Sequence, residues 1–201
     1  MKALIVAAGL LVGCSGVGFA QDDDGEEERA RQPADAHADQ LEALLKKLVG
    51  SLRAKKTEVA SEALRSLVPN KEAVEAALTK EGFAALGGKV QAHAKEIFGA
   101  GPQAALEKLG ITPEFRKVDV FSATTEDLKS MEAETTAARE FASGLRTCAD
   151  HLKPATTFYC ARLYPRGAED DPQAGVRLQL FYMHEDRFVY LGPLWKLAAA
   201  E

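Results

Sequence analysis

The sequence is short of several features on which function is usually predicted. It has three cysteines among 201 residues and no Cys-x-x-Cys pair, so it carries no thiol-redox motif. After residue 20 it has no run of about 20 continuous apolar residues, which a membrane span needs. Signatures such as HExxH, GxSxG, Walker A and GxGxxG are also absent. We therefore predict no cofactor and no metal site from linear motifs.

Positive charge is also limited, with 25 lysines and arginines against 30 acidic residues. Residues 21–35 hold seven of these acidic residues and two arginines, so residues 36–201 carry a net charge of only −1. A near-neutral domain gives no reason to expect binding to nucleic acid or to an anionic membrane surface. The acidic run at residues 21–28 has no aliphatic or aromatic side chain. This composition predicts that residues 21–36 are a disordered acidic linker.

The first twenty residues have the pattern of an export signal. Lys2 precedes a short apolar run, Ala3 to Val12. Two processing sites compete after it. One is a lipobox, Leu11-Val12-Gly13-Cys14, in which Cys14 becomes lipidated; the other is an ordinary cleavage site, Gly18-Phe19-Ala20. Both predict export, either as a periplasmic or secreted protein or as a lipoprotein that meets the membrane only through its anchor.

Export makes the two remaining cysteines informative. Cys148 and Cys160 are the only thiols in the part of the chain that should fold. An even pair in an exported protein indicates a disulfide, which would stabilise the fold by roughly 3 kcal/mol by closing a short loop. The alternative is a pair of buried free cysteines that never meet.

The first half of the chain repeats apolar residues at helical spacing. Leu41, Leu44, Leu45, Leu48 and Leu52 predict a helix over residues 38–54. The glycine pair at 87–88 interrupts a helical pattern that otherwise runs to residue 98, which predicts a kink, a break or a close backbone contact. Further helices are predicted with Thr57 as N-cap, with Asn70 as N-cap before Lys71, and from Pro102 to Leu109 with Gly110 as C-cap.

The second half has the pattern of an antiparallel sheet. All four tyrosines and the single tryptophan lie between Thr156 and Trp195, and aromatic residues suit a half-buried pleated surface. Strands are predicted over residues 115–121, 156–164, 176–183 and 187–191. A capping box at Thr124 and Asp127 predicts a helix between the first two strands, and an alanine-rich helix over residues 133–152 should be weak at Gly144.

Helices followed by mostly adjacent strands predict an α+β fold. We expect one domain, residues 37–201, in which several N-terminal helices pack on a curled four-stranded antiparallel sheet. Helices on a curled sheet are similar, as a fold-level analogy, to the cystatin-like fold of nuclear transport factor and ketosteroid isomerase. Such folds include both enzymes and binding modules.

Three stretches carry a closer resemblance. They are Ser122 to Leu128, Leu152 to Tyr159, and Arg187 to Lys196, the last containing Pro193-Leu194-Trp195. Together they resemble an uncharacterised family of exported bacterial proteins with a helical N-terminal half, a C-terminal antiparallel sheet and a closing Pro-x-Trp strand. The resemblance implies the architecture and the export, and it implies no activity.

His93 is the most interesting titratable residue in the sequence. It shares a predicted buried stripe with Val90 and Ile97. One interpretation makes His93 a pocket base, its pKa changed by burial, with Asp119 or a sheet tyrosine as its proton partner. The alternative is a hydrogen-bonded histidine at the edge of the core.

An apolar surface on the sheet is the second candidate. Strict alternation would place Phe181 and Met183 opposite Val176, Leu178 and Leu180. With Phe188 or Tyr190 these two side chains could form an exposed patch that binds a partner protein, a small apolar ligand or a second copy of the chain. The alternative is that the long 165–175 loop or the C-terminal leucines cover them.

Three functions remain open from the sequence. The first is an exported, non-enzymatic binding domain that uses the C-terminal sheet. The second is a pocket enzyme of the isomerase or hydrolase type around His93, and the third is an anchored structural envelope protein.

Overall fold

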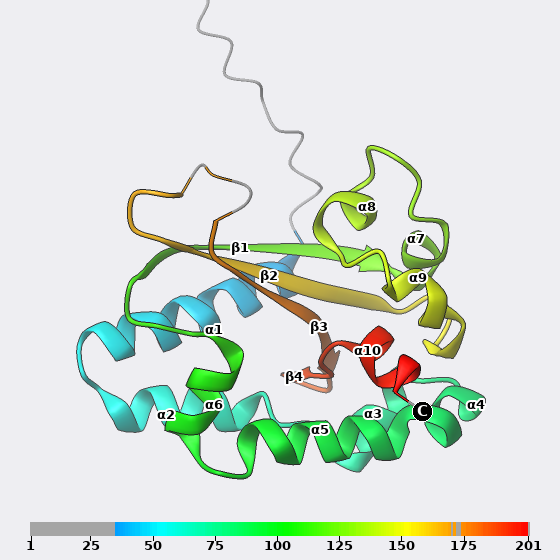
Figure 1. The fold of residues 1–201 in the computed structure, drawn as a ribbon, viewed down its shortest axis with the longest axis horizontal. Coiled ribbons are helices and arrows are strands. Elements are labelled where there is room, and N and C mark those ends of the chain that lie inside the picture. Colours follow the sequence, from blue (N-terminus) through cyan, green and yellow to red (C-terminus); the bar gives the residue numbers. More distant parts are fainter. Residues whose placement is uncertain (1–34, 170, 172–173, 201) are drawn as a thin grey trace, which may run out of the picture. The chain divides into compact units, whose positions relative to one another are not determined.

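Helices occupy the first half of the chain and an antiparallel sheet the second, which confirms the predicted α+β class. The computed structural model of the protein describes residues 35–169, 171 and 174–200, and these belong to one unit, Pro33–Glu201 (Figure 1). The predicted signal segment and acidic linker lie, apart from residues 35 and 36, outside the described residues. The helical half contains α1 (Ala36–Arg53), α2 (Thr57–Ser66), α3 (Lys71–Ala77), α4 (Lys80–Gly82), the π-helix η1 (Phe83–Gly87), α5 (Gly88–Phe98) and α6 (Pro102–Leu109).

Four antiparallel strands form one open sheet in the order β1-β2-β3-β4. Their bounds are β1 (Phe115–Thr124), β2 (Thr157–Pro165), β3 (Val176–His184) and β4 (Arg187–Tyr190). Short helices fill the connection between β1 and β2 and gather at one end of these strands in Figure 1. They are α7 (Thr125–Ser130), α8 (Thr136–Glu140), α9 (Leu145–Cys148) and the 3-10 turn η2 (Ala149–His151), and α10 (Leu194–Ala199) follows the sheet.

Both faces of the sheet are covered by helices. The first core joins one face to α1, α2 and α6, and the second core joins the other face to α3, α5 and the short helices α7 to α10. Residues of β2 alternate between the two, with Tyr159 and Ala161 in the first core and Phe158 and Cys160 in the second. Seven consecutive residues of β2 are buried for this reason. The sheet is therefore an internal layer rather than a wall with one free face.

Local capping signals place several elements where the sequence predicts them. The Asn70 side chain accepts a hydrogen bond from the backbone of Ala73 at 2.9 Å and opens α3. Thr124 and Asp127 form both hydrogen bonds of the predicted capping box at the start of α7. The predicted cap at Thr57 is wrong, since Thr57 is the first residue of α2 and the preceding residue is the N-cap.

The glycine pair produces the close contact that the sequence predicts. A β-carbon at Gly87 would lie 2.7 Å from the Phe83 ring, whereas one at Gly88 would meet nothing within 4 Å. Residues Phe83–Gly87 form the π-helical segment η1, and α5 continues from it without a cap. Gly87 thus lets an aromatic ring pack directly on the helix backbone.

Two elements near the C-terminal half differ from the predictions. The alanine-rich segment 133–152 forms the two short helices α8 and α9 instead of one interrupted helix. Between them, a β-carbon at Gly144 would lie 2.5 Å from the Trp195 ring.

Trp195 itself belongs to helix α10, so the closing Pro-x-Trp strand implied by the resemblance is wrong. Helix α10 follows the edge strand β4 in the chain, and it packs against α9 instead of adding a strand to the sheet.

A bulge in β3 changes which residues share a face. Tyr159 pairs with Phe181 and Ala161 pairs with Leu178, so two steps along β2 match three steps along β3. The extra residue is accommodated by Leu180, which has a positive φ of 65°. The bulge rotates the strand, and Leu178 and Phe181 both enter the first core while Leu180 enters the second.

Candidate functional site

The aromatic residues predicted to form an exposed patch lie mostly inside the first core. Phe181 is fully buried, Phe188 and Tyr190 retain 4% and 8% exposure, and Met183 packs against them from a partly buried position. The Phe181 and Tyr190 rings lie 5.1 Å apart, and Phe188 packs edge-on against another sheet tyrosine. The predicted exposed patch is therefore wrong, because helices cover both faces of the sheet and leave neither free.

The two cysteines predicted to form a disulfide are free and buried in the second core. Cys148 on α9 donates its thiol to the carbonyl of Leu145, and Cys160 on β2 donates to the carbonyl of Glu140. Burial raises the pKa of Cys148 to about 11 and holds that of Cys160 well above its ordinary value. The predicted disulfide is therefore wrong in this structure, and Cys14 lies outside the described residues.

His93 and Asp119 are not brought together. His93 on α5 packs its ring against Gly192, where a β-carbon would lie 2.7 Å from the imidazole Cδ2. Asp119 lies on β1 and pairs with Lys117 at 3.1 Å. Gly192 follows β4, and β1 and β4 are opposite edges of the sheet, roughly 14 Å apart at about 4.8 Å per strand spacing. In the described residues no hydrogen bond joins His93 to Asp119 or to a sheet tyrosine.

The imidazole of His93 is also poorly arranged for proton transfer. Its Nε2 is buried and makes no hydrogen bond with any residue that the structure describes. Its Nδ1 lies 3.9 Å from a carboxylate oxygen of Glu96. Burial lowers the pKa of His93, and the charge of Glu96 offsets part of this effect.

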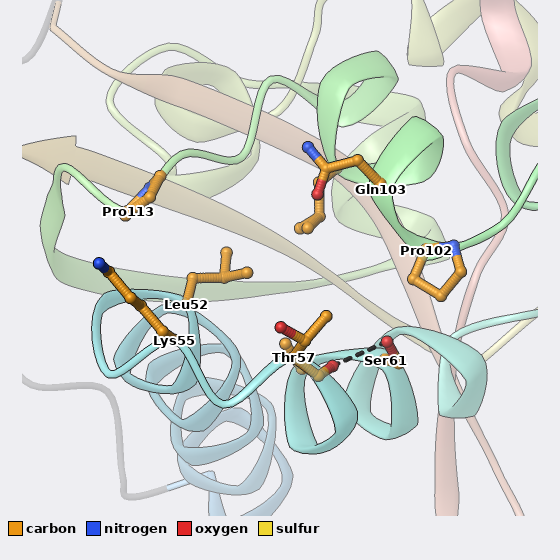
Figure 2. A pocket seen from close by; sticks show the side chains of 9 residues that line it. Leu52, Lys55, Thr57, Ser61, Pro102, Gln103 and Pro113 are labelled. Carbon is orange, nitrogen blue, oxygen red and sulfur yellow. Dashed lines mark hydrogen bonds between the residues drawn. The ribbon is translucent and has the colours of Figure 1, made fainter.

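A hollow between α2 and α6 is the best candidate site in the described chain. It has a volume of about 390 Å³ and lies beside the turn from α1 into α2 (Figure 2). Most of its wall is apolar or proline. We call this cavity the large hollow. Its lining residues are Leu52, Lys55, Thr57, Ala60, Ser61, Pro102, Gln103, Leu106 and Pro113.

The hollow results from small side chains on α2 and from two sharp turns of the backbone. Ala60 and Ser61 have small side chains, which leave space between α2 and α6. Lys55, with a positive φ of 56°, turns the chain sharply from α1 into α2. Gly101, with a φ of 98°, turns it into α6 at Pro102, the first residue of that helix. Figure 2 shows Gln103 above the hollow and Thr57 and Ser61 along its floor.

The polar groups of the large hollow are few and mostly held in place. Ser61 donates its hydroxyl to the backbone carbonyl of Thr57 at 2.8 Å, so its oxygen can still accept a hydrogen bond from a ligand. Gln103 donates from its amide to Glu107 at 3.2 Å, which fixes the orientation of the amide. Lys55 lies at the opposite end of the hollow beside Pro113 (Figure 2).

A second, smaller hollow adjoins the first. It has a volume of about 210 Å³, and Pro102 borders both. The α2 residues that line the two hollows recur at helical spacing and so form one stripe along the helix. They are Thr57, Ala60 and Ser61 in the large hollow and Leu64 and Arg65 in the small one.

Sequence reasoning missed the large hollow entirely. Its floor and roof come from segments about 45 residues apart, and nothing in either segment indicates that they meet. The one local signal is the pair of small residues at 60 and 61 on the buried stripe of α2. Small residues on such a stripe are equally compatible with close helix packing, so this signal cannot identify a site.

A charge cluster around the buried Arg162 side chain was also missed. Arg162 in β2 has a side chain only 7% exposed, and it meets the Glu140 carboxylate at 2.7 Å. Arg177, directly across from Arg162 in β3, lies 3.8 Å from the same carboxylate. Gln179 on β3 anchors the neighbouring backbone of α8, donating to the Glu140 carbonyl and accepting from Ala142. The cluster fastens α8 to the sheet.

The described residues contain no group of three or more His, Cys, Asp or Glu side chains placed to hold a metal ion. Among the same residues, no helix is both long and apolar enough to cross a membrane. No protein-family model, curated protein or solved structure matches the chain.

Proposed function

We propose that the protein is an exported, non-enzymatic binding domain that takes a small, mainly apolar ligand in the large hollow. This keeps the binding function expected from the sequence but moves it from the sheet to the seam between α2 and α6. The predicted patch on the sheet cannot serve as the binding surface, because Phe181, Phe188 and Tyr190 are buried.

The observation that carries the proposal is the size and lining of the hollow. Sites for small molecules occupy about 300–1,000 Å³ and combine apolar walls with a few fixed polar groups. The large hollow has about 390 Å³, apolar side chains from three helices, and polar groups at Thr57, Ser61 and Gln103. An apolar cavity of about 150 Å³ holds one benzene ring, so the large hollow has room for roughly 15 non-hydrogen atoms.

The proposal is tested with 1-octanol, a neutral ligand that fits this volume. Titration calorimetry of the wild type should detect saturable binding. Gln103 is exposed at the rim, so Gln103→Trp should fold normally and fill the opening, lowering affinity at least tenfold. Ala92→Trp, at an exposed position on α5 away from the hollow, is the matched control and should bind as the wild type does. Equal binding by both variants would place the ligand elsewhere.

Export is the second part of the proposal and rests on residues 2–20. Labelling cells with a radioactive fatty acid distinguishes the two processing sites. A labelled wild type and an unlabelled Cys14→Ser variant would support the lipobox; an unlabelled wild type found outside the cytoplasm would support cleavage after Ala20. Full-length protein retained in the cytoplasm would contradict both.

A further inference from the structure

The charge at the large hollow points to the chemistry of its ligand. Of its nine lining residues, Lys55 is the only charged one. The remaining polar side chains are uncharged, and among the residues that the structure describes no carboxylate lines the hollow. A ligand in this hollow would therefore meet a mainly apolar surface with three uncharged polar side chains and a single positive charge at one end.

The Lys55 ammonium is available to a ligand. In the part of the chain that the structure describes, it makes no ion pair and no hydrogen bond. Other lysines are engaged, such as Lys117 with Asp119 and Lys129 with Asp150. Lys55 is also exposed, so it can reach a group at the mouth of the hollow without first leaving a partner.

The helices around the hollow add to the same positive potential. Both α2 and α6 begin at its rim, at Thr57 and Pro102, and neither has a side-chain N-cap hydrogen bond. The N-terminal end of a helix carries a partial positive charge that favours an anion within the first turn. Glu58 lies in the first turn of α2 but does not line the hollow.

We propose that the ligand is a small amphiphile, with an apolar body in the large hollow and an anionic group at Lys55. This inference rests on the proposed function, because it specifies the ligand of the same hollow. The roughly 15 non-hydrogen atoms that fit there correspond to a carboxylate with a chain of medium length, not to a full membrane lipid.

The test compares octanoate with 1-octanol, which share the same chain and differ in the charge of the head group. The wild type should bind octanoate about threefold more tightly than octanol, the size expected for a solvent-exposed ion pair. Raising the salt concentration from about 0.05 M to about 0.5 M should shrink that preference, because exposed charges are screened.

Variants at two neighbouring lysines assign the preference to one residue. Lys55→Met should remove it, leaving both ligands bound alike, and Lys55→Arg should keep it. Lys56→Met changes an exposed lysine that does not line the hollow, and it should behave as the wild type does.

Two results would overturn the inference while the hollow remains a binding site: equal affinities for both ligands in the wild type, or a preference that survives in Lys55→Met. If neither ligand binds the wild type, the proposed function fails, and this inference fails with it.

Discussion

One nitrogen of the His93 imidazole is shielded from water and has no hydrogen-bond partner among the described residues. Its Nε2 is buried against the backbone at Gly192, while its Nδ1 faces Glu96 near the surface. Protonation would place an N–H⁺ group at the buried position with no acceptor, and this is why burial lowers the pKa of His93. The packing that opposes its use as a general base thus makes it sensitive to acid.

We expect His93 to make the fold less stable as the pH falls. The pKa of an unfolded histidine is about 6.5, and that of folded His93 is lower, so between the two values the unfolded chain binds more protons. The contribution of neutral His93 is complete above about pH 6.5 and is lost as the pH drops toward the folded pKa. Urea unfolding at about pH 7.5 and 5.5 should show this loss in the wild type.

His93→Gln should reduce that pH difference, because glutamine does not titrate. His37→Gln, at an exposed histidine, serves as the control and should keep the full difference. A pH difference of the same size in His93→Gln and in the wild type would show that other groups produce it.

Arg162 illustrates a buried charge that local sequence cannot account for. An arginine in the middle of an otherwise apolar strand looks like a residue for a solvent-exposed face, yet it is only 6% exposed. Its charge is tolerated because Glu140 from α8 and the Tyr164 hydroxyl lie against it. The partner carboxylate is 22 residues away along the chain, so the pairing emerges only when α8 folds onto the sheet.

At the scale of elements, the sequence predicts where helices begin better than it predicts irregularities inside an element, such as the bulge in β3. The caps at Asn70 and Thr124 mark real helix starts, because the side chain and the backbone group that it bonds lie within three residues. The bulge at Leu180 was not predictable, since a non-glycine residue with positive φ is normally unfavourable by about 1–2 kcal/mol. Here that conformation lets Leu180 enter the second core while Phe181 remains in the first.

The glycine pair at the start of α5 gives a matched test of helix packing. Gly88 is exposed and has ordinary helical dihedral angles, with open space where a β-carbon would lie. Gly88→Ala should therefore raise the free energy of unfolding by about 0.5–1 kcal/mol through helix propensity. Gly87→Ala gains the same propensity but places its methyl group against the Phe83 ring at 2.7 Å. We expect it to lower the free energy of unfolding by about 1–3 kcal/mol.

Urea denaturation of both variants measures the difference between the two positions. If Gly87→Ala and Gly88→Ala both raise the free energy of unfolding by a similar amount, the Phe83 ring must move aside without a cost in stability. Gly87 would then not be required for the packing of η1. Destabilisation by both would instead contradict the open space at Gly88.

At the scale of the whole molecule, burial of both sheet faces explains which predictions failed. The class and the strands could be predicted because they depend on periodicity within each segment. The patch at Phe181 and the disulfide at Cys148 and Cys160 depended on which surfaces meet, and a single sequence does not specify that. The large hollow belongs to the same category, because it exists only where α2 and α6 are brought together.

The two free thiols report on the opening of the whole second core. Cys148 comes from α9 and Cys160 from β2, and both are essentially inaccessible to solvent. Their raised pKa values also keep them as unreactive thiols rather than thiolates. We expect a Cys14→Ser variant to show no rapid thiol labelling when native and two reactive thiols when denatured in urea, and its melting temperature should not change when a reductant is added.

The same labelling distinguishes global from local opening. If the second core opens only when the domain unfolds, both thiols should react at one rate, and this rate should rise with urea as steeply as the global unfolding equilibrium does. Faster labelling of Cys148 with little dependence on urea would mean that α9 detaches from the sheet by itself. The Glu140–Arg162 pair and the Gln179 contacts that fasten neighbouring α8 to the sheet argue for the single, global rate.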